Sequence, residues 1–314
     1  LSACTSTATS GDSSSKDGKL AVMASFYPLQ YLAEKIGGEH VTVTSLTPAG
    51  AEPHDLELSP KTVDALASAD AVVYLAGFQA AVDEAIEQQA PTTVIDVSPA
   101  VELVEANSSA NHPSEDEDAD EAQSGEAEGH DHEAEGHEHH HDMTADPHFW
   151  LDPVRMAKAA TLVGDKLAEA DPANADTYKA NAQALNEELS ALGDDLVAKT
   201  ATCQIKTFVT AHTAFGYLAD RTGLTQVGIS GLDPDSSPSP ARLAEISQIA
   251  KDQGVTTIFT EALIDPKVAQ TLADDLGIST AVLDPIESQT DSSKDYAAVM
   301  NDNIDALTKA NNCQ

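Results

Sequence analysis

The sequence is poor in basic residues, in aromatic residues and in cysteine, and each shortage narrows the range of functions. Only 16 Lys and Arg residues stand against 53 Asp and Glu residues, which gives a formal charge of −37 at pH 7. Such a charge argues against binding to nucleic acid or to an anionic membrane surface. No run approaches the roughly 18 apolar residues that span a bilayer. Aromatic residues make up 4% of the chain, but its 41% hydrophobic content is sufficient for a normal core. The composition indicates an acidic protein that attracts cations.

The three cysteines show no Cys-x-x-Cys spacing, so a cysteine-based zinc site is not expected. Residues 1–4, Leu-Ser-Ala-Cys, resemble the lipobox of bacterial lipoproteins, and the Ser-, Thr- and Gly-rich residues 5–18 resemble a flexible tether. We therefore expect an extracytoplasmic lipoprotein, at the cell surface or in the periplasm, that touches the membrane only through a lipid on Cys4. The remaining pair, Cys203 and Cys313, then predicts one disulfide, as is usual in exported proteins.

Strand-length apolar runs alternate with amphipathic helical stretches in both halves of the chain. In the first half, strands are predicted at 20–25, 41–46, 71–75 and 92–97, and helices at 28–36 and 60–68. In the second half, strands are predicted at 207–210, 225–229, 256–260 and 280–283, and helices at 214–222, 240–253, 266–276 and 296–310. This alternation is typical of βαβ units, so we predict an α/β fold of two lobes, each with a mainly parallel sheet flanked by helices.

Two segments interrupt the alternation. Residues 106–145 combine low hydrophobicity with dense acidic residues and many histidines, which excludes a packed core there. Residues 153–199 are rich in Ala, Leu, Glu and Lys, and Asp171-Pro172 divides them into two helices, of which the second is long enough to join two lobes rigidly. The predicted organisation is a tether at 1–18, a first lobe at 19–152 that contains the His/acid-rich loop, joining helices at 153–199 and a second lobe at 200–314.

Three isolated histidines lie in turn-like contexts. His54 follows the predicted strand 41–46, His212 follows the strand 207–210, and His148 precedes the joining helices. Ligands of parallel α/β sheets bind in the crevice beyond the carboxyl ends of the strands. We therefore expect the three imidazoles to converge on the cleft between the lobes, in a nitrogen-rich site suited to Zn²⁺.

The second lobe is expected to supply the fourth ligand. Asp284, which follows the strand 280–283, is the best candidate. Glu261 also ends a predicted strand and is either a ligand or the acceptor that orients an imidazole N–H, and Glu52 is a further candidate. The histidines of the acidic loop are expected to bind zinc weakly and to feed the cleft or sense excess metal; they are His130, His132, His137, His139, His140 and His141.

The motifs at 48–55, 146–153, 210–212 and 282–285 resemble those of the metal-specific substrate-binding proteins of bacterial ABC importers, the cluster A-I that contains zinc- and manganese-binding lipoproteins. The resemblance extends over residues 19–313. It implies two α/β lobes joined by one long, rigid helix, with a metal held in the cleft by residues of both lobes. It also implies a monomer that delivers the metal to a membrane permease, driven by a partner ATPase.

The resemblance also bears on which metal is carried. Manganese members of this family use two His, a Glu and an Asp, whereas zinc members place a third His where the Glu stands and often have a His-rich loop. His212 and the loop therefore favour Zn²⁺ over Mn²⁺, in agreement with the preference of manganese for oxygen ligands. Some zinc members have an acidic residue directly before the first His, but here Pro53 occupies that position and Glu52 lies one residue further away. This departure leaves the fourth ligand open between Asp284 and water.

A zinc-dependent hydrolase is the enzymatic alternative, because three protein ligands and an open position also form a catalytic pattern. The sequence contains no His-Glu-x-x-His motif, so we do not expect an enzyme. A manganese-binding protein of the same family, or a metal-buffering adhesin, would also fit these residues. The prediction is an extracytoplasmic protein that captures Zn²⁺ and delivers it to an ABC permease for high-affinity uptake.

Overall fold

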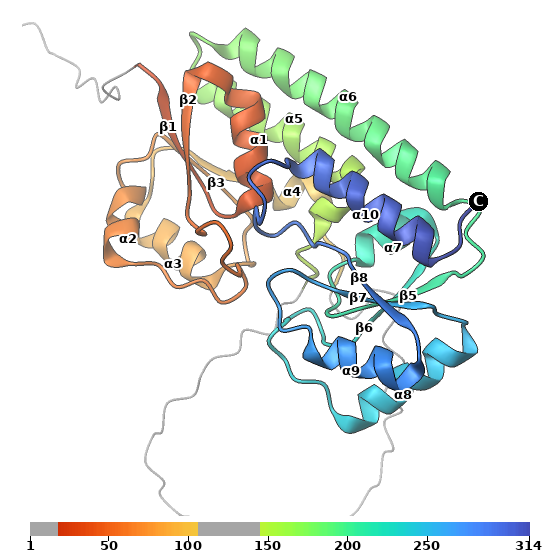
Figure 1. Ribbon diagram of the computed structural model, residues 1–314. Coiled ribbons are helices and arrows are strands. Elements are labelled where there is room, and N and C mark those ends of the chain that lie inside the picture. The colour runs from red at the N-terminus through yellow and green to blue at the C-terminus, as the bar shows by residue number, and fades with distance from the viewer. Residues whose placement is uncertain (1–17, 106–144) are drawn as a thin grey trace, which may run out of the picture.

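The chain forms two α/β lobes, each built on a four-stranded parallel sheet (Figure 1). The computed structural model describes residues 18–105 and 145–314. The first sheet has the order β2-β1-β3-β4 and the second the order β6-β5-β7-β8. The strands are β1 (Leu20–Ala24), β2 (Val41–Ser45), β3 (Ala71–Tyr74), β4 (Val94–Asp96), β5 (Thr207–Thr210), β6 (Thr225–Gly228), β7 (Thr257–Thr260) and β8 (Ser279–Val282). Each predicted strand has its counterpart, and the predicted fold class is confirmed.

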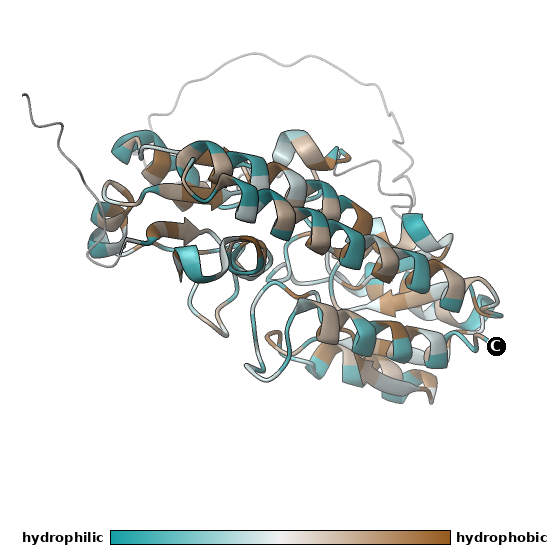
Figure 2. Ribbon diagram, turned by 90° about the horizontal axis from the view of Figure 1, so that it is seen from above, coloured by the Kyte–Doolittle hydropathy of each residue, from teal (hydrophilic) through white to brown (hydrophobic). Residues whose placement is uncertain are grey.

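Helices cover both faces of each sheet. The first lobe contains α1 (Tyr27–Gly37), the short 3₁₀ helix η1 (Gly38–His40), α2 (Pro60–Leu66), α3 (Ala80–Gln89) and α4 (Ser98–Val101). The second contains α7 (Gly216–Thr222), α8 (Pro240–Asp252), α9 (Lys267–Leu276) and α10 (Tyr296–Ala310). Helices α3 and α4 have no counterpart among the predicted helices. Seen from above, the long helices alternate between hydrophilic and hydrophobic residues along the ribbon, as expected for helices with one buried face (Figure 2).

Two helices in the middle of the chain pack against each other, and the longer one lies along both lobes (Figure 1). They are α5 (Pro153–Ala170), which the 3₁₀ helix η2 (Phe149–Leu151) precedes, and α6 (Ala175–Thr200). They pack closely because small residues meet between them: a Cβ atom added to Gly164 would lie 2.3 Å from the Cβ of Ala182. Helix α6 contacts α1 of the first lobe and α7 and α10 of the second. A long helix thus spans the junction between the lobes.

The hydrophobic core is continuous through this junction. One cluster joins the inner faces of both sheets to α5 and α6, and two smaller clusters lie under α2 and α3 and under α8 and α9. Trp150 is fully buried in the shared cluster, and its indole N–H donates to the carbonyl oxygen of Pro285 at 2.7 Å. Tyr296 at the start of α10 donates in turn to the carbonyl oxygen of Trp150. The residues that follow His148 therefore anchor the second lobe.

The predicted disulfide between Cys203 and Cys313 is present in the structure. It ties the segment after α6 to the residues after α10, across a sequence separation of 110 residues. Cys4 and the tether lie outside the described residues. Within residues 18–105 and 145–314, no helix has the length and apolar character that a bilayer crossing requires.

Candidate metal centre

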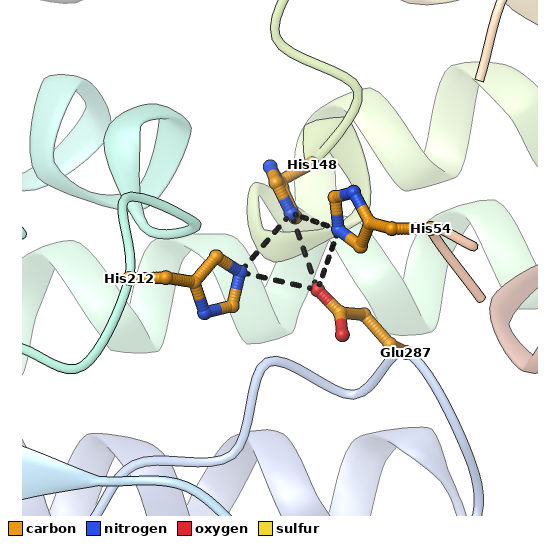
Figure 3. Close-up of side chains that lie close together, drawn as sticks. All are labelled: His54, His148, His212 and Glu287. Atoms are coloured by element: carbon orange, nitrogen blue, oxygen red, sulfur yellow. Dashed lines mark hydrogen bonds and ion pairs between the residues drawn. The ribbon is translucent and has the colours of Figure 1, made fainter. Parts of the chain in front are cut away.

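Four side chains from distant parts of the chain converge between the lobes (Figure 3). They are His54 on the loop after β2, His148 directly before η2, His212 after β5 and Glu287 after β8. One ligand atom of each lies within 4.8 Å of the others. The three predicted histidines are thus brought together, and a glutamate completes the group.

The spacing of these four atoms fits one small cation. The Nε2 atom of His148 lies 3.3 Å from that of His54 and 3.4 Å from that of His212. The Oε1 atom of Glu287 lies 3.1 Å from Nε2 of His148 and 3.4 Å from Nε2 of both other histidines. A tetrahedral zinc ion with bonds of about 2.0–2.1 Å requires ligand atoms about 3.3–3.4 Å apart. Five of the six separations among the four atoms match this value, and the sixth, between His54 and His212, is at most 4.8 Å, so the group has the size of a site for one small cation such as zinc.

The outer nitrogens of two imidazoles are fixed by carboxylates. Nδ1 of His148 lies 2.8 Å from Oδ1 of Asp146, and Nδ1 of His212 lies 2.8 Å from Oε2 of Glu261. A carboxylate at Nδ1 keeps the hydrogen on that nitrogen and turns the lone pair of Nε2 inward. The Nε2 lone pairs of His148 and His212 then face the negatively charged carboxylate of Glu287 at contact distance. These electron-rich atoms repel one another unless a cation or added protons lie between them.

The centre is almost completely shielded from solvent, and this shapes its protonation. The side chain of His54 is 5% exposed, that of Glu287 3%, and those of His148 and His212 0%. Burial lowers the pKa of His54. Burial also acts on His212, but the carboxylates of Glu261 and Glu287 outweigh it and raise the pKa of His212 to about 10. Neighbouring carboxylates raise the pKa of His148 in the same way. Burial opposes ionisation of Glu287, yet the three imidazoles hold its pKa well below the usual range.

Strand ends position the ligands of the second lobe. In the order β6-β5-β7-β8, successive strands are added on opposite sides of β5, so a crevice opens between the carboxyl ends of β5 and β7. His212 lies two residues after β5, and Glu261 directly follows β7. Their side chains meet across this crevice, which explains the hydrogen bond between them.

Two buried glutamines hold the loops that carry histidines. The Nε2 atom of Gln79 donates to the carbonyl oxygen of Pro53, the residue before His54, at 3.1 Å. The Nε2 atom of Gln226 donates to the carbonyl oxygen of His212, also at 3.1 Å. Both glutamines are buried. Each lobe thus fixes the main chain at its own histidine with one amide.

Contrary to the prediction, Asp284 does not belong to the group, and Glu287 takes its place. The Oδ1 atom of Asp284 accepts the main-chain N–H of Ile286 at 2.7 Å, so this carboxylate closes a turn in its own loop. Ile286 adopts a φ of 58°, a left-handed conformation that β-branched residues rarely adopt. This turn redirects the chain and brings Glu287 to the imidazoles. The only sequence signal for Glu287 is its place three residues after the predicted candidate.

The remaining predicted site residues lie around this group or outside the described residues. Glu261 lies at Nδ1 of His212, the position of an orienting acceptor. Glu52 accepts the main-chain N–H of His54 at 2.9 Å, and its other oxygen lies 4.0 Å from Nε2 of His54. Asp146, which was not among the predicted site residues, is fully buried and holds His148. The loop histidines from His130 to His141 lie outside the described residues.

Comparison with known proteins relates most of the chain to one family. The model of the family described as "Zinc-uptake complex component A periplasmic" matches residues 22–310. The zinc-binding protein AdcA of Streptococcus pyogenes serotype M3 is 34% identical over 306 residues, which cover 93% of this chain but 56% of that protein. The chain thus spans little more than half the length of the streptococcal AdcA proteins that it matches.

One further protein and one isolated domain match over nearly their full length. The high-affinity zinc uptake system protein ZnuA of Bacillus subtilis is 36% identical over 315 residues, which cover 98% of this chain and 92% of that protein. The crystal structure of the Zn(II)-bound ZnuA-like domain of Streptococcus pneumoniae AdcA superimposes with a TM-score of 0.72 at 30% identity, covering 94% of this chain and 99% of that domain.

Proposed function

Because this chain belongs to the family of zinc-uptake complex component A proteins, we propose that it captures Zn²⁺ outside the cytoplasm and delivers it to an ABC permease. His54, His148, His212 and Glu287 hold the ion between the lobes. A partner ATPase drives import, and a lipid on Cys4 keeps the protein at the membrane. Zinc is the cargo of this site and leaves it unchanged.

The observation that carries the proposal is the convergence of three imidazole nitrogens and one carboxylate oxygen within 4.8 Å of one another in a buried centre. Imidazole suits zinc, whereas manganese favours sites built from oxygen ligands. The Glu287 carboxylate offsets one of the two charges of the ion, and Asp146 and Glu261 lie directly behind the imidazoles. The three imidazole nitrogens therefore support zinc rather than manganese as the cargo, and the carboxylates offset the charge of the ion.

The donor set also argues against a hydrolase. Catalytic zinc sites combine three protein ligands with an open position for water, whereas structural and storage sites use four protein ligands. Here the fourth vertex holds the Glu287 carboxylate, which lies within 3.4 Å of all three imidazole nitrogens. A protein carboxylate thus takes the position that water occupies in catalytic zinc sites, which supports binding and release of the ion rather than catalysis.

Metal competition tests the proposed cargo. We expect the metal-free protein to bind one Zn²⁺ tightly in the cleft and to prefer it to Mn²⁺ by at least about a hundredfold, because nitrogen ligands follow the usual affinity order of divalent metals. Titration with a competing chelator measures this preference. A variant without residues 113–142 separates the cleft from the weaker binding expected of the loop histidines. Preferential binding of Mn²⁺, or hydrolytic turnover by the zinc-loaded protein, would contradict the proposal.

Zinc affinity is expected to fall as the pH falls. Although burial opposes it, Glu261 and Glu287 raise the pKa of His212 to about 10, so the metal-free centre carries a proton at neutral pH. Zinc binds only the neutral imidazole and must displace this proton, which weakens binding by about tenfold per pH unit for each proton displaced. Chelator competition between pH 8 and pH 6, with proton release measured calorimetrically in two buffers, checks the slope. A constant affinity over this range would show that no proton is displaced.

A further inference from the structure

A hydrogen bond links the two lobes beside the metal centre. The main-chain N–H of Gly50, on the first-lobe loop that leads to His54, donates to Oγ of Ser288 at 2.7 Å. Ser288 directly follows Glu287 on the second lobe and is 6% exposed. The bond thus joins the loop of one ligand to the loop of another, from opposite sides of the cleft.

The conformation of Gly50 makes its N–H available for this contact. The residues around it form a turn that is closed by a hydrogen bond from the N–H of Ala51 to the carbonyl oxygen of Pro48, at 3.0 Å. Gly50 has a φ of 77°, which glycine adopts without strain. The turn does not use the N–H of Gly50, which can therefore reach across the cleft to Ser288.

The loop that carries Glu287 is held by two hydrogen bonds, one inside the core and one that involves an exposed residue. On one side, the Pro285 carbonyl accepts the indole N–H of Trp150 inside the core shared by both lobes. On the other side, Ser288 accepts the N–H of Gly50, which is exposed. Separation of the lobes can leave the Trp150 contact intact, but it must break the contact between Gly50 and Ser288.

We propose that the hydrogen bond from Gly50 to Ser288 is a latch that keeps the lobes closed around the bound cation. Ser288 is then a positioning residue that sets the rate of metal release without being a ligand. This inference rests on the proposed function, in which the cleft must open for the ion to leave. The latch delays release because it breaks before Glu287 and His54 can move apart.

The Ser288→Ala variant tests the latch. We expect it to release zinc about two- to tenfold faster, because the loss of one hydrogen bond of ordinary strength changes a rate by about that factor. The association rate should be unchanged. Release is measured by stopped-flow transfer of zinc from the loaded protein to an excess of chelator. Ser288→Thr retains the hydroxyl and should restore slow release.

Ser98→Ala is the matched control, because the Ser98 hydroxyl donates to Asp96 at 2.7 Å entirely within the first lobe. It should release zinc at the wild-type rate. If the wild-type protein fails to retain zinc, the proposed function itself is wrong. If the wild type retains zinc but Ser288→Ala releases it no faster, or Ser98→Ala accelerates release equally, the latch is excluded.

Discussion

Replacing His148 with alanine is expected to weaken zinc binding by on the order of 10²–10³-fold. His148 is fully buried, and its Nε2 atom lies 3.1–3.4 Å from the ligand atoms of all three other members of the group. A zinc site with four protein ligands is worth roughly 10–16 kcal/mol, so each ligand contributes about 2.5–4 kcal/mol. Titration with a chelator of matched affinity measures the loss.

His40→Ala is the control for this prediction. His40 lies at the end of η1, where its ring contacts Tyr178 far from the cleft, and its replacement should leave zinc affinity unchanged. Because His148 is buried, thermal unfolding of both metal-free variants should be recorded to confirm that they fold. A folded His148→Ala protein with wild-type affinity would mean that zinc binds elsewhere.

Replacing Glu287 with alanine is expected to weaken zinc binding by a similar factor, on the order of 10²–10³-fold, because each of the four ligands contributes a similar part of the binding free energy. The carboxylate is 3% exposed and is the negatively charged member of a centre that otherwise consists of imidazoles. Its removal takes away both a ligand and the charge that offsets the cation. Because manganese prefers oxygen ligands, the variant should lose more affinity for Mn²⁺ than for Zn²⁺, which titration with both ions can measure.

Asp284→Asn is the matched comparison, because it decides between the two carboxylates of the same loop. Asparagine keeps an oxygen that can accept the N–H of Ile286, as Asp284 does at 2.7 Å. We therefore expect Asp284→Asn to change zinc affinity by less than about tenfold, the lower end of the effect of residues behind a ligand. If Asp284→Asn lost more zinc affinity than Glu287→Ala, Asp284 rather than Glu287 would be the fourth ligand.

Local patterns in the sequence were enough to predict the fold class and the histidines. Short runs such as 207–210 and 256–260 combine β-branched and apolar residues because strands of a parallel sheet are buried on both faces. A residue that follows such a run must lie at the carboxyl edge of the sheet. His212 and Glu261 satisfy this condition, and they hydrogen-bond across the crevice between β5 and β7.

The fourth member of the group could not be predicted in this way. Asp284 and Glu287 both follow β8, and strand periodicity does not extend into the loop. The choice between them depends on the left-handed conformation of Ile286, which the surrounding structure imposes against the preference of a β-branched residue. Tertiary contacts such as the one from Trp150 to Pro285 hold that loop in place.

The sequence by itself determined the two-lobed α/β architecture, the three imidazoles and the disulfide pair, because these follow from the alternation of strand and helix patterns, from isolated histidines beside those elements and from the number of cysteines. The tertiary structure alone decided that Glu287 faces the imidazoles, that Asp146 orients His148, and that Gly50 meets Ser288 across the cleft. These three contacts depend on the directions in which loops turn. Those directions result from packing and hydrogen bonds between residues far apart in the chain, and no local pattern records them.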